Sequence, residues 1–154
     1  MSKNKNLCDG NKEKIFCKMQ SEENNTYADL FDFKMLIVYI NGAQKSRLEN
    51  FFEDIGFYYY ACTSKVETVW SERLKHKNTN VWPGSDCIFM LTVPGKHLDF
   101  MLKMLKTFRM SLPEGIAMGL GVIPMDRVIP RVYDDESIPV DEELLKRLKE
   151  KHSK

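Results

Sequence analysis

The stretch MLIVYINGAQKSRLENFFEDIGFYYYACT, residues 35–63, sets the first half of the fold. Its six leading residues, 35–40, are all apolar and end at an Asn-Gly pair, which is typical of a buried strand followed by a turn. Large apolar residues then recur at i, i+3, i+4 and i+7, namely Leu48, Phe51, Phe52 and Ile55. This spacing predicts an amphipathic helix that Gly56 ends. The aromatic, β-prone run at 57–63 predicts a second strand.

The pattern repeats in the second half of the chain. Residues 87–93, CIFMLTV, predict a third strand, and residues 96–112 carry one apolar helical stripe that ends before Pro113. Residues 116–123 predict a fourth strand. The resulting β-α-β-β-α-β order predicts an α+β, ferredoxin-like fold, because right-handed crossovers place both helices on one face of a four-stranded antiparallel sheet.

The ends of the chain differ from its centre. Residues 1–32 are polar and aperiodic, so they are predicted to be a flexible N-terminal head. The folded domain is assigned to 33–130, and a C-terminal extension to 131–154. The extension contains a short charged helix that begins at Asp141 and has a thin apolar edge, formed by Leu144, Leu145 and Leu148.

Composition narrows the class of protein. The chain has 154 residues, enough for one domain, with 23 Lys and Arg against 22 Asp and Glu and a net charge of +1. That balance argues against a nucleic-acid or membrane-surface binder, which usually needs a dominant basic field. No apolar run is long enough to span a membrane, and no apolar segment follows the charged N-terminus as in a secretory signal. A cytoplasmic protein is expected.

Three of the predicted strands predict self-association. Residues 35–40, 87–93 and 116–123 are apolar at nearly every position, whereas a sheet with one face in water alternates apolar and polar residues. Both faces must therefore be covered, and two helices cover only one. We expect a homotrimer with its sheets facing inward, because closed cyclic symmetry buries such a face. The alternative is that the terminal helix folds back over the bare face.

Catalytic and metal-binding patterns are absent from the sequence. It contains no HExxH, no GxSxG, no P-loop lysine motif and no dinucleotide fingerprint. We therefore predict that the protein is not an enzyme and assign no catalytic residue. His76, His97 and His152 share no ligand-like spacing, so they are interpreted as surface residues and no metal site is predicted.

Two further pairs of residues have structural interpretations. Cys62 and Cys87 lie in apolar runs without a C-x-x-C spacing, so they are interpreted as small buried hydrophobic residues. Gly119 and Gly121 lie in the fourth strand and not before a helix, which favours close packing or a bulge at a subunit contact over a nucleotide-binding turn.

Residues 64–85 are the strongest functional feature. Part of Val66 to Leu74 could extend the second strand or form a helical turn, but much of the stretch is predicted to be a long loop, which is uncommon in a compact domain unless it serves a function. Its middle is basic and suits an anionic ligand or an acidic partner, with Arg73, Lys75, His76 and Lys77. It ends in Trp82-Pro83-Gly84, an aromatic residue followed by turn residues. We expect residues 64–79 to be mobile and cut first by trypsin, and Trp82 to be anchored.

A β-α-β-β-α-β unit with a long loop between strands two and three resembles the P-II nitrogen-regulatory superfamily. The segment Val81-Trp82-Pro83-Gly84 is similar to a Trp-Pro-Gly signature of a P-II-like branch, and the resemblance covers about residues 33–130. It implies a trimeric signalling protein in nitrogen regulation. Such proteins bind a small effector, typically an adenine nucleotide, between subunits, and their loop engages a transporter, an enzyme or a regulatory protein.

The resemblance also implies where the effector lies. Typical members have a Gly-rich, Lys-bearing phosphate loop before the fourth strand, whereas this chain has SLPEG at 111–115. Basic residues after that strand match in kind, as Arg127 and Arg131. An anionic effector, a nucleotide or another small molecule, is therefore expected between subunits near the base of the 64–85 segment, beside Trp82 and Gly84.

Two alternatives stay open. The arginines could instead pair with surface carboxylates, namely Asp126, Asp134 or Asp135. The protein could also be a metal-binding or metal-tolerance trimer on the same fold, although Asn80 stands where the branch often has a histidine before Trp-Pro-Gly.

Overall fold

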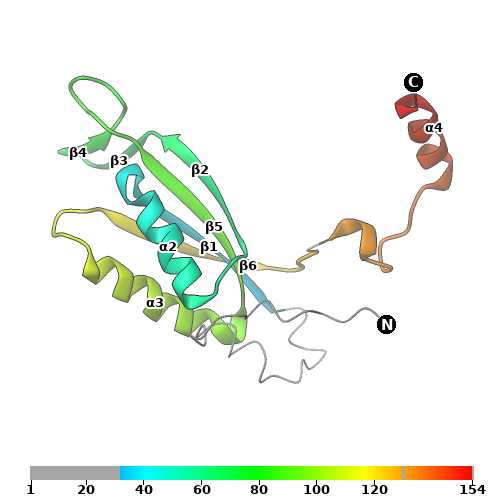
Figure 1. Ribbon diagram of the computed structural model, residues 1–154, viewed down its shortest axis with the longest axis horizontal. Helices are drawn as coiled ribbons and strands as arrows, with labels where there is room; N and C mark the ends of the chain where they lie inside the picture. The colour runs from blue at the N-terminus through cyan, green and yellow to red at the C-terminus, as the bar shows by residue number, and fades with distance from the viewer. Residues whose placement is uncertain (1–31, 130, 154) are drawn as a thin grey trace.

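A four-stranded antiparallel sheet forms the centre of the fold (Figure 1). The structure is a computed structural model that describes residues 32–129 and 131–153. The main elements are β1 (Phe33–Asn41), α2 (Lys45–Ile55), β2 (Tyr60–Val66), β5 (Asp86–Pro94), α3 (Leu98–Ser111) and β6 (Met118–Met125). The strand order is β2-β5-β1-β6 with every pair antiparallel. This arrangement confirms the predicted α+β, ferredoxin-like fold.

Local capping explains where the helices begin and end. The Asn41 side chain accepts a hydrogen bond from the Ala43 N–H at 2.9 Å and opens the short 3-10 turn η2 (Gly42–Gln44) before α2. Gly56 ends α2 in the left-handed conformation, with φ at 75°, which glycine adopts without steric cost. A second 3-10 turn, η3 (Gly95–His97), leads into α3. Both predicted helices are confirmed.

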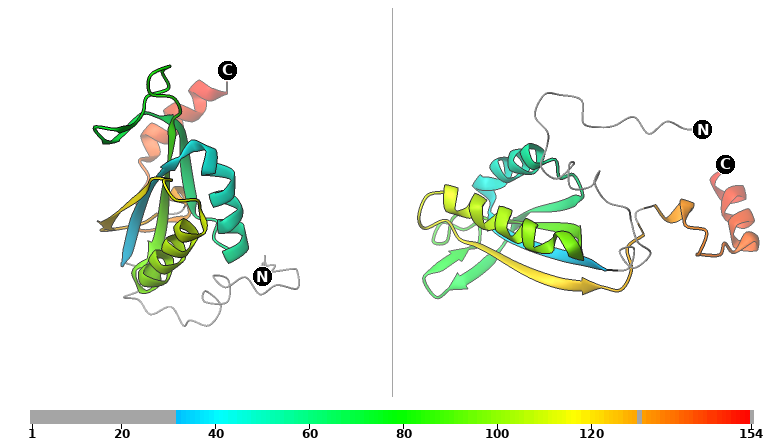
Figure 2. Two further views of the ribbon diagram at one scale, coloured as in Figure 1. Left: turned by 90° about the vertical axis from the view of Figure 1, so that its left-hand side faces the viewer. Right: turned by 90° about the horizontal axis from the view of Figure 1, so that it is seen from below.

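Both helices cover the same face of the sheet and enclose the core (Figure 2). Three alternate residues of β1 are fully buried there, namely Leu36, Val38 and Ile40. Phe52 of α2 lies at the centre of this core and is itself fully buried. Its ring centroid lies 5.0–5.8 Å from the centroids of Phe57, Tyr60 and Phe89. Aromatic packing between α2, β2 and β5 therefore holds the layers together.

Two strands begin later than the sequence predicts. The second predicted strand starts at 57, but Phe57 donates its N–H to the Phe52 carbonyl at 2.8 Å and closes the end of α2. β2 begins only at Tyr60. The fourth starts at Met118, because Ile116 closes a turn on the Pro113 carbonyl at 3.5 Å after α3. In each case the residues that strand propensity assigns to the sheet form a turn after a helix, so the strand begins later.

Residues 64–85 are part strand and part loop: strand structure is present within Val66 to Leu74, as the sequence left open, and residues 77–85 lie outside any strand. β2 continues to Val66, and β3 (Thr68–Ser71) pairs antiparallel with β4 (Leu74–His76) as a separate two-stranded sheet. We call residues 68–76 the hairpin. Half-buried and exposed residues alternate from Val66 to Ser71, which is the period-2 pattern of a strand with one side against the protein.

The sheet face opposite the helices is apolar and partly open. Strand register places on this face the residues Met35, Ile37, Tyr39, Ile88, Met90, Gly121 and Ile123. The hairpin lies on the same side of the sheet, at one end only (Figure 2). The prediction that these strands are apolar on both faces while two helices cover one is confirmed, and the trimer that it implies stays a prediction.

The C-terminal extension lies apart from the sheet (Figure 1). It contains the 3-10 turn η4 (Val132–Asp134) and the helix α4 (Glu142–His152), which has no buried residue. The alternative in which this helix covers the bare sheet face is therefore wrong for this structure. The predicted head, 1–32, falls almost entirely outside the described residues. Among the described helices, none has the length and apolarity needed to cross a membrane.

Replacing Phe52 tests the core directly. The change Phe52→Ala should lower the free energy of unfolding by about 3–5 kcal/mol, because it removes a fully buried ring and leaves a cavity. Urea unfolding followed by circular dichroism measures the loss. The control is Met110→Ala, since Met110 is exposed and its loss should cost about 0.5 kcal/mol or less. Equal losses in the two variants would contradict this description of the core.

Candidate functional site

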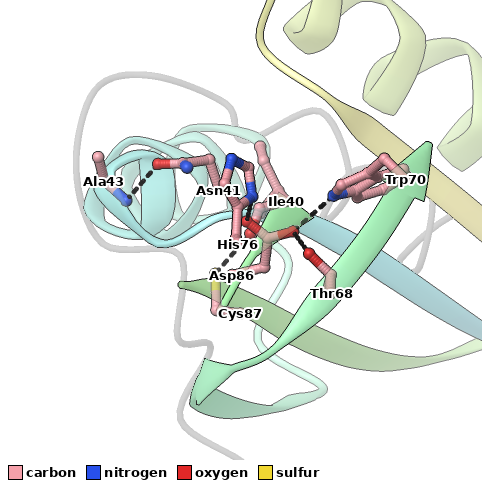
Figure 3. A network of polar contacts seen from close by, with 8 residues as sticks. All are labelled: Ile40, Asn41, Ala43, Thr68, Trp70, His76, Asp86 and Cys87. Atoms are coloured by element: carbon pink, nitrogen blue, oxygen red, sulfur yellow. Dashed lines mark hydrogen bonds and ion pairs between the residues drawn. The ribbon is translucent and has the colours of Figure 1, made fainter. Parts of the chain in front are cut away.

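A buried carboxylate lies beneath the hairpin. Asp86 is the first residue of β5, and none of its surface is exposed. Its Oδ2 accepts hydrogen bonds from the Thr68 hydroxyl at 2.5 Å and from the Trp70 indole N–H at 2.7 Å (Figure 3). The Nδ1 atom of His76 lies 2.7 Å from Oδ1. Three side chains of the hairpin therefore converge on one carboxylate, which we call the Asp86 clamp.

Ladder geometry explains this convergence. Thr68 and Trp70 are two residues apart on β3, so their side chains leave the same side of the strand. His76 on β4 is the register partner of Thr68, which places it on that side as well. One face of a two-stranded ribbon thus presents three hydrogen-bonding side chains to β5.

The charge on Asp86 requires these contacts. An ionised carboxylate is costly to bury unless hydrogen bonds or an opposite charge replace its hydration. Thr68 and Trp70 supply neutral donors, and His76, with 15% of its side chain exposed, supplies either a neutral N–H or a positive charge. The clamp therefore fixes the hairpin to the sheet, because moving the hairpin away would strip the carboxylate of these partners.

Trp70 also packs against the sheet. Its ring lies edge-on to Tyr39 of β1 with a centroid distance of 6.4 Å. A Cβ atom added to Gly119 of β6 would lie 2.9 Å from Trp70 Cζ3. Gly119 therefore permits the close approach of the indole ring, which confirms the close-packing interpretation of this glycine. Its packing partner belongs to the same chain.

The Trp-Pro-Gly segment closes the base of the hairpin. The Trp82 carbonyl accepts hydrogen bonds from the N–H groups of Lys77 and Thr79, each at 3.1 Å. The carbonyl of Gly84, a residue with φ at 82°, accepts a bond from the Asn78 N–H at 2.9 Å. The Lys75 Nζ lies 4.9 Å above the Trp82 ring, a cation–π contact. These contacts hold the half-buried Trp82 against the hairpin.

The four basic residues predicted to face a partner do not act alike. Arg73 is exposed at the turn between β3 and β4, and Lys75 and Lys77 are half-buried near Trp82. His76 points inward to Asp86, so its interpretation as a surface residue is wrong. The reason is the contact with the buried Asp86 carboxylate, which holds the His76 imidazole inside although its neighbours in the sequence are exposed or half-buried cations.

Arg127 and Arg131 lie at the other end of the sheet from the clamp. Register pairs Met125 with Phe33, whereas Asp86 pairs with Asn41, eight strand steps away. At about 3.3 Å per residue this separation is roughly 26 Å. Within one chain the structure therefore does not bring the arginines to Trp82 and Gly84.

Both arginines have partners in the extension. Arg127 Nη2 donates to Asp135 Oδ2 at 2.9 Å and contacts the Ser137 hydroxyl. Arg131 Nε lies 3.4 Å from Asp134 Oδ2. Hydrogen bonds from Ser137, followed by the charge of Arg127, lower the pKa of the Asp135 carboxyl. Pairing with Asp134 and Asp135, the alternative raised from the sequence, is thus what the structure contains.

The remaining candidate ligands are dispersed. Cys87 is buried, and burial raises the pKa of its thiol to about 12, which keeps it protonated as a structural residue. Cys62 is half-buried. His97 is buried at the start of α3 and is not a surface residue, whereas His152 is exposed. Within residues 32–129 and 131–153, no three His, Cys, Asp or Glu side chains form a group able to hold a metal ion.

Comparison with known proteins identifies similar folds only. No protein-family model matches the chain, and no curated protein is similar to it. Among solved structures, the nitrogen regulatory PII-like protein CPII of Thiomonas intermedia K12, bound to ADP and bicarbonate, covers 63% of this chain and 91% of its own, with 13% identity and a TM-score of 0.46.

Two further structures show the same level of similarity. A PII-like signalling protein of Thermus thermophilus shares 16% identity over 63% of this chain and 90% of its own, with a TM-score of 0.44. A functionally unknown protein of Pediococcus pentosaceus shares 13% identity over 66% and 99%, with a TM-score of 0.47. The chain is similar in fold to PII-like proteins, and at these values the similarity says nothing about its ligand.

Removing the clamp carboxylate tests its structural role. The change Asp86→Ala should lower the free energy of unfolding by about 2–4 kcal/mol, because hydrogen bonds to a charged group are worth roughly 1.5–3 kcal/mol each and water recovers part of the loss. Trypsin should then cut at Arg73 earlier than in the parent. The exposed Asp99→Asn is the control. Unchanged proteolysis in Asp86→Ala would show that the hairpin does not depend on the clamp.

Two glycines on one strand provide a matched test of the Trp70 contact. Gly119→Ala should displace the Trp70 ring and destabilise the protein by about 1–3 kcal/mol, because the new methyl group overlaps the indole. Gly121→Ala should leave the hairpin unchanged, since its added Cβ has no neighbour within 4 Å. Tryptophan fluorescence and thermal unfolding distinguish the two variants, and a similar response in both would contradict this packing.

Proposed function

We propose that the protein is a non-enzymatic, PII-like regulatory protein that acts as a homotrimer. In this proposal a small effector binds between subunits, and the hairpin with the following 77–85 segment contacts a protein partner such as a transporter or a regulatory protein. The single observation that carries the proposal is an apolar sheet face that the helices leave uncovered, with a clamped hairpin at one end of it.

The open face supports self-association. Met90 is 40% exposed and Ile123 45% exposed, and Met35, Ile37 and Ile88 lie beside them in register. An apolar patch of this kind in water favours burial against another surface. A second copy offers the same patch, and closed symmetry lets every copy bury it.

The hairpin supports a role in partner binding. Its base is held by Asp86, whereas Arg73 at its turn is exposed and the neighbouring Glu72 is also exposed. A firmly held base lowers the conformational entropy that binding would cost, because less of the segment has to be ordered. Together with Lys75 and with Lys77, which directly follows the hairpin, Arg73 outweighs Glu72 and gives this segment a cationic character suited to an acidic partner surface.

The proposed effector site requires more than one chain. Arg127 and Arg131 of one subunit lie far from Trp82 and Gly84 of the same subunit, so a shared site needs the Trp82 end of a neighbouring copy. The hollow beside Arg131 is also lined by Asp134, Asp135 and Glu136. A nucleotide or another anion would have to replace these carboxylates as the partner of the guanidinium groups. Effector binding would then release the 131–137 segment.

A concentration series tests the trimer. At its dilute end, light scattering after size exclusion should give three times the mass of the chain. Met90→Glu should reduce the measured mass to that of one chain, because the substitution places a charge on the open face. The circular dichroism spectrum should stay unchanged. The control is Met110→Glu, since Met110 is exposed on α3. A parent protein that stays monomeric throughout would overturn the trimer.

Calorimetry tests the effector. ADP, ATP and AMP are the probes, and Arg127→Ala with Arg131→Ala should weaken nucleotide binding at least tenfold while Arg47→Ala, an exposed arginine of α2, should not. Nucleotide binding that is unaffected by both arginine changes would contradict the proposed site. Binding of Zn²⁺ or Cu²⁺ with no nucleotide binding would favour the alternative, a metal-binding trimer.

A further inference from the structure

The helix α4 carries an apolar edge that no other part of the chain described by the structure buries. None of its eleven residues, Glu142–His152, is buried, and Leu144 and Leu148 are each 43% exposed. Leu145 is half-buried beside them. Leu148 lies one helical turn beyond Leu144 and Leu145, at i+4 and i+3, so the three form one stripe along the helix.

A helix of eleven residues is too short to be stable by itself in water. Isolated helices shorter than about 12–15 residues are marginal in water, and packing of an apolar face usually stabilises them. The Asp141 carboxylate caps the first turn by accepting the Leu144 N–H at 2.9 Å. Such caps contribute about 1 kcal/mol, which leaves the leucine stripe in need of a partner surface.

The charges of α4 are segregated along its axis. Its first turn carries Glu142 and Glu143, and its last turn carries Lys149, Lys151 and His152 with Glu150 between the lysines, so that end is net basic. This order suits the helix dipole within one copy. It also means that a second helix running in the opposite direction would place its basic end beside the acidic end of the first.

We propose that α4 pairs antiparallel with the α4 of a second copy of this chain. With Leu144 of one helix level with Leu148 of the other, Asp141 comes level with Lys151 at both ends of the pair. Glu142 comes level with Glu150, so the attraction is between the acidic first turn as a whole and the net basic last turn. The leucine stripes bury each other, and opposite charges flank them. A parallel pair would instead place like charges level with each other. The two-fold symmetry uses the same patch on both copies and therefore closes.

The α4 helix of a second copy fits α4 better than the open sheet face does. Met35, Ile37, Met90 and Ile123 on that face carry no charge that could pair with the two ends of the helix. The pairing is also independent of the proposed trimer, because α4 lies apart from the sheet (Figure 1). If both hold, two trimers associate; if the trimer fails, two single chains associate.

Light scattering of the full chain tests the pairing. At the concentrated end of a dilution series, the parent should reach twice the mass that it has at the dilute end. Leu148→Glu should abolish this doubling, and Val132→Glu, at an exposed residue of the extension, should not. A parent that never doubles, or a Leu148→Glu variant that doubles normally, would overturn the proposal. A Leu148→Glu variant with a larger mass than the parent would mean that α4 normally covers the open face of its own sheet. That result would overturn the proposal as well.

Charge changes test the direction of the pair. The double change Glu142→Lys with Glu143→Lys should prevent doubling, and so should Lys149→Glu with Lys151→Glu. An equimolar mixture of the two variants should double again, because one helix is then basic at both ends and the other acidic. If the helices paired in parallel, both double variants would still double in mass, since like charges already face each other in the parent. That result would contradict the antiparallel arrangement.

Discussion

The buried carboxylate of Asp86 is the constraint on which the hairpin and its end of the sheet depend. It stands at the first position of a central strand, where it has no access to water, so its hydrogen bonds must come from the protein. All of the side-chain partners seen in the clamp, Thr68, Trp70 and His76, come from the hairpin. Burial of one charge therefore determines where a segment of nine residues lies, and the strand that carries it is itself fixed by the core under α2 and α3.

The clamp separates a covered end of the open sheet face from an exposed end. Trp70 reaches over β1 and β6 and covers one end of the open face, which is possible because Gly119 has no side chain. Beyond Trp70 that face stays apolar and partly exposed. The turn at Arg73 stays in water. The segment is thus rigid at its base and accessible at its turn, an arrangement that suits recognition of a partner.

Sequence periodicity predicted the core fold because the signals there are local. The helical stripe around Phe52 and the apolar strand before Asn41 each lie within one turn or one strand. The sequence left Val66 to Leu74 open between a strand extension and a helical turn, because the alternation from Val66 to Ser71 spans only six residues and its pairing partner β4 is shorter still. Asp86 was missed because its partners lie 10–18 residues away in the chain. The arginine pairs with Asp134 and Asp135 were foreseen as an alternative, since short separation makes such pairs common.

Hydrogen exchange of the two tryptophan indoles measures the clamp most directly, because the chain has only Trp70 and Trp82. The Trp70 indole N–H is bonded to a fully buried carboxylate at 2.7 Å, whereas the Trp82 ring lies half-buried beneath Lys75. Nuclear magnetic resonance should therefore show one indole proton that exchanges slowly, as core amides do, and one that exchanges fast. Fast exchange of both indole protons in the native protein would contradict the view that Asp86 holds the hairpin in place.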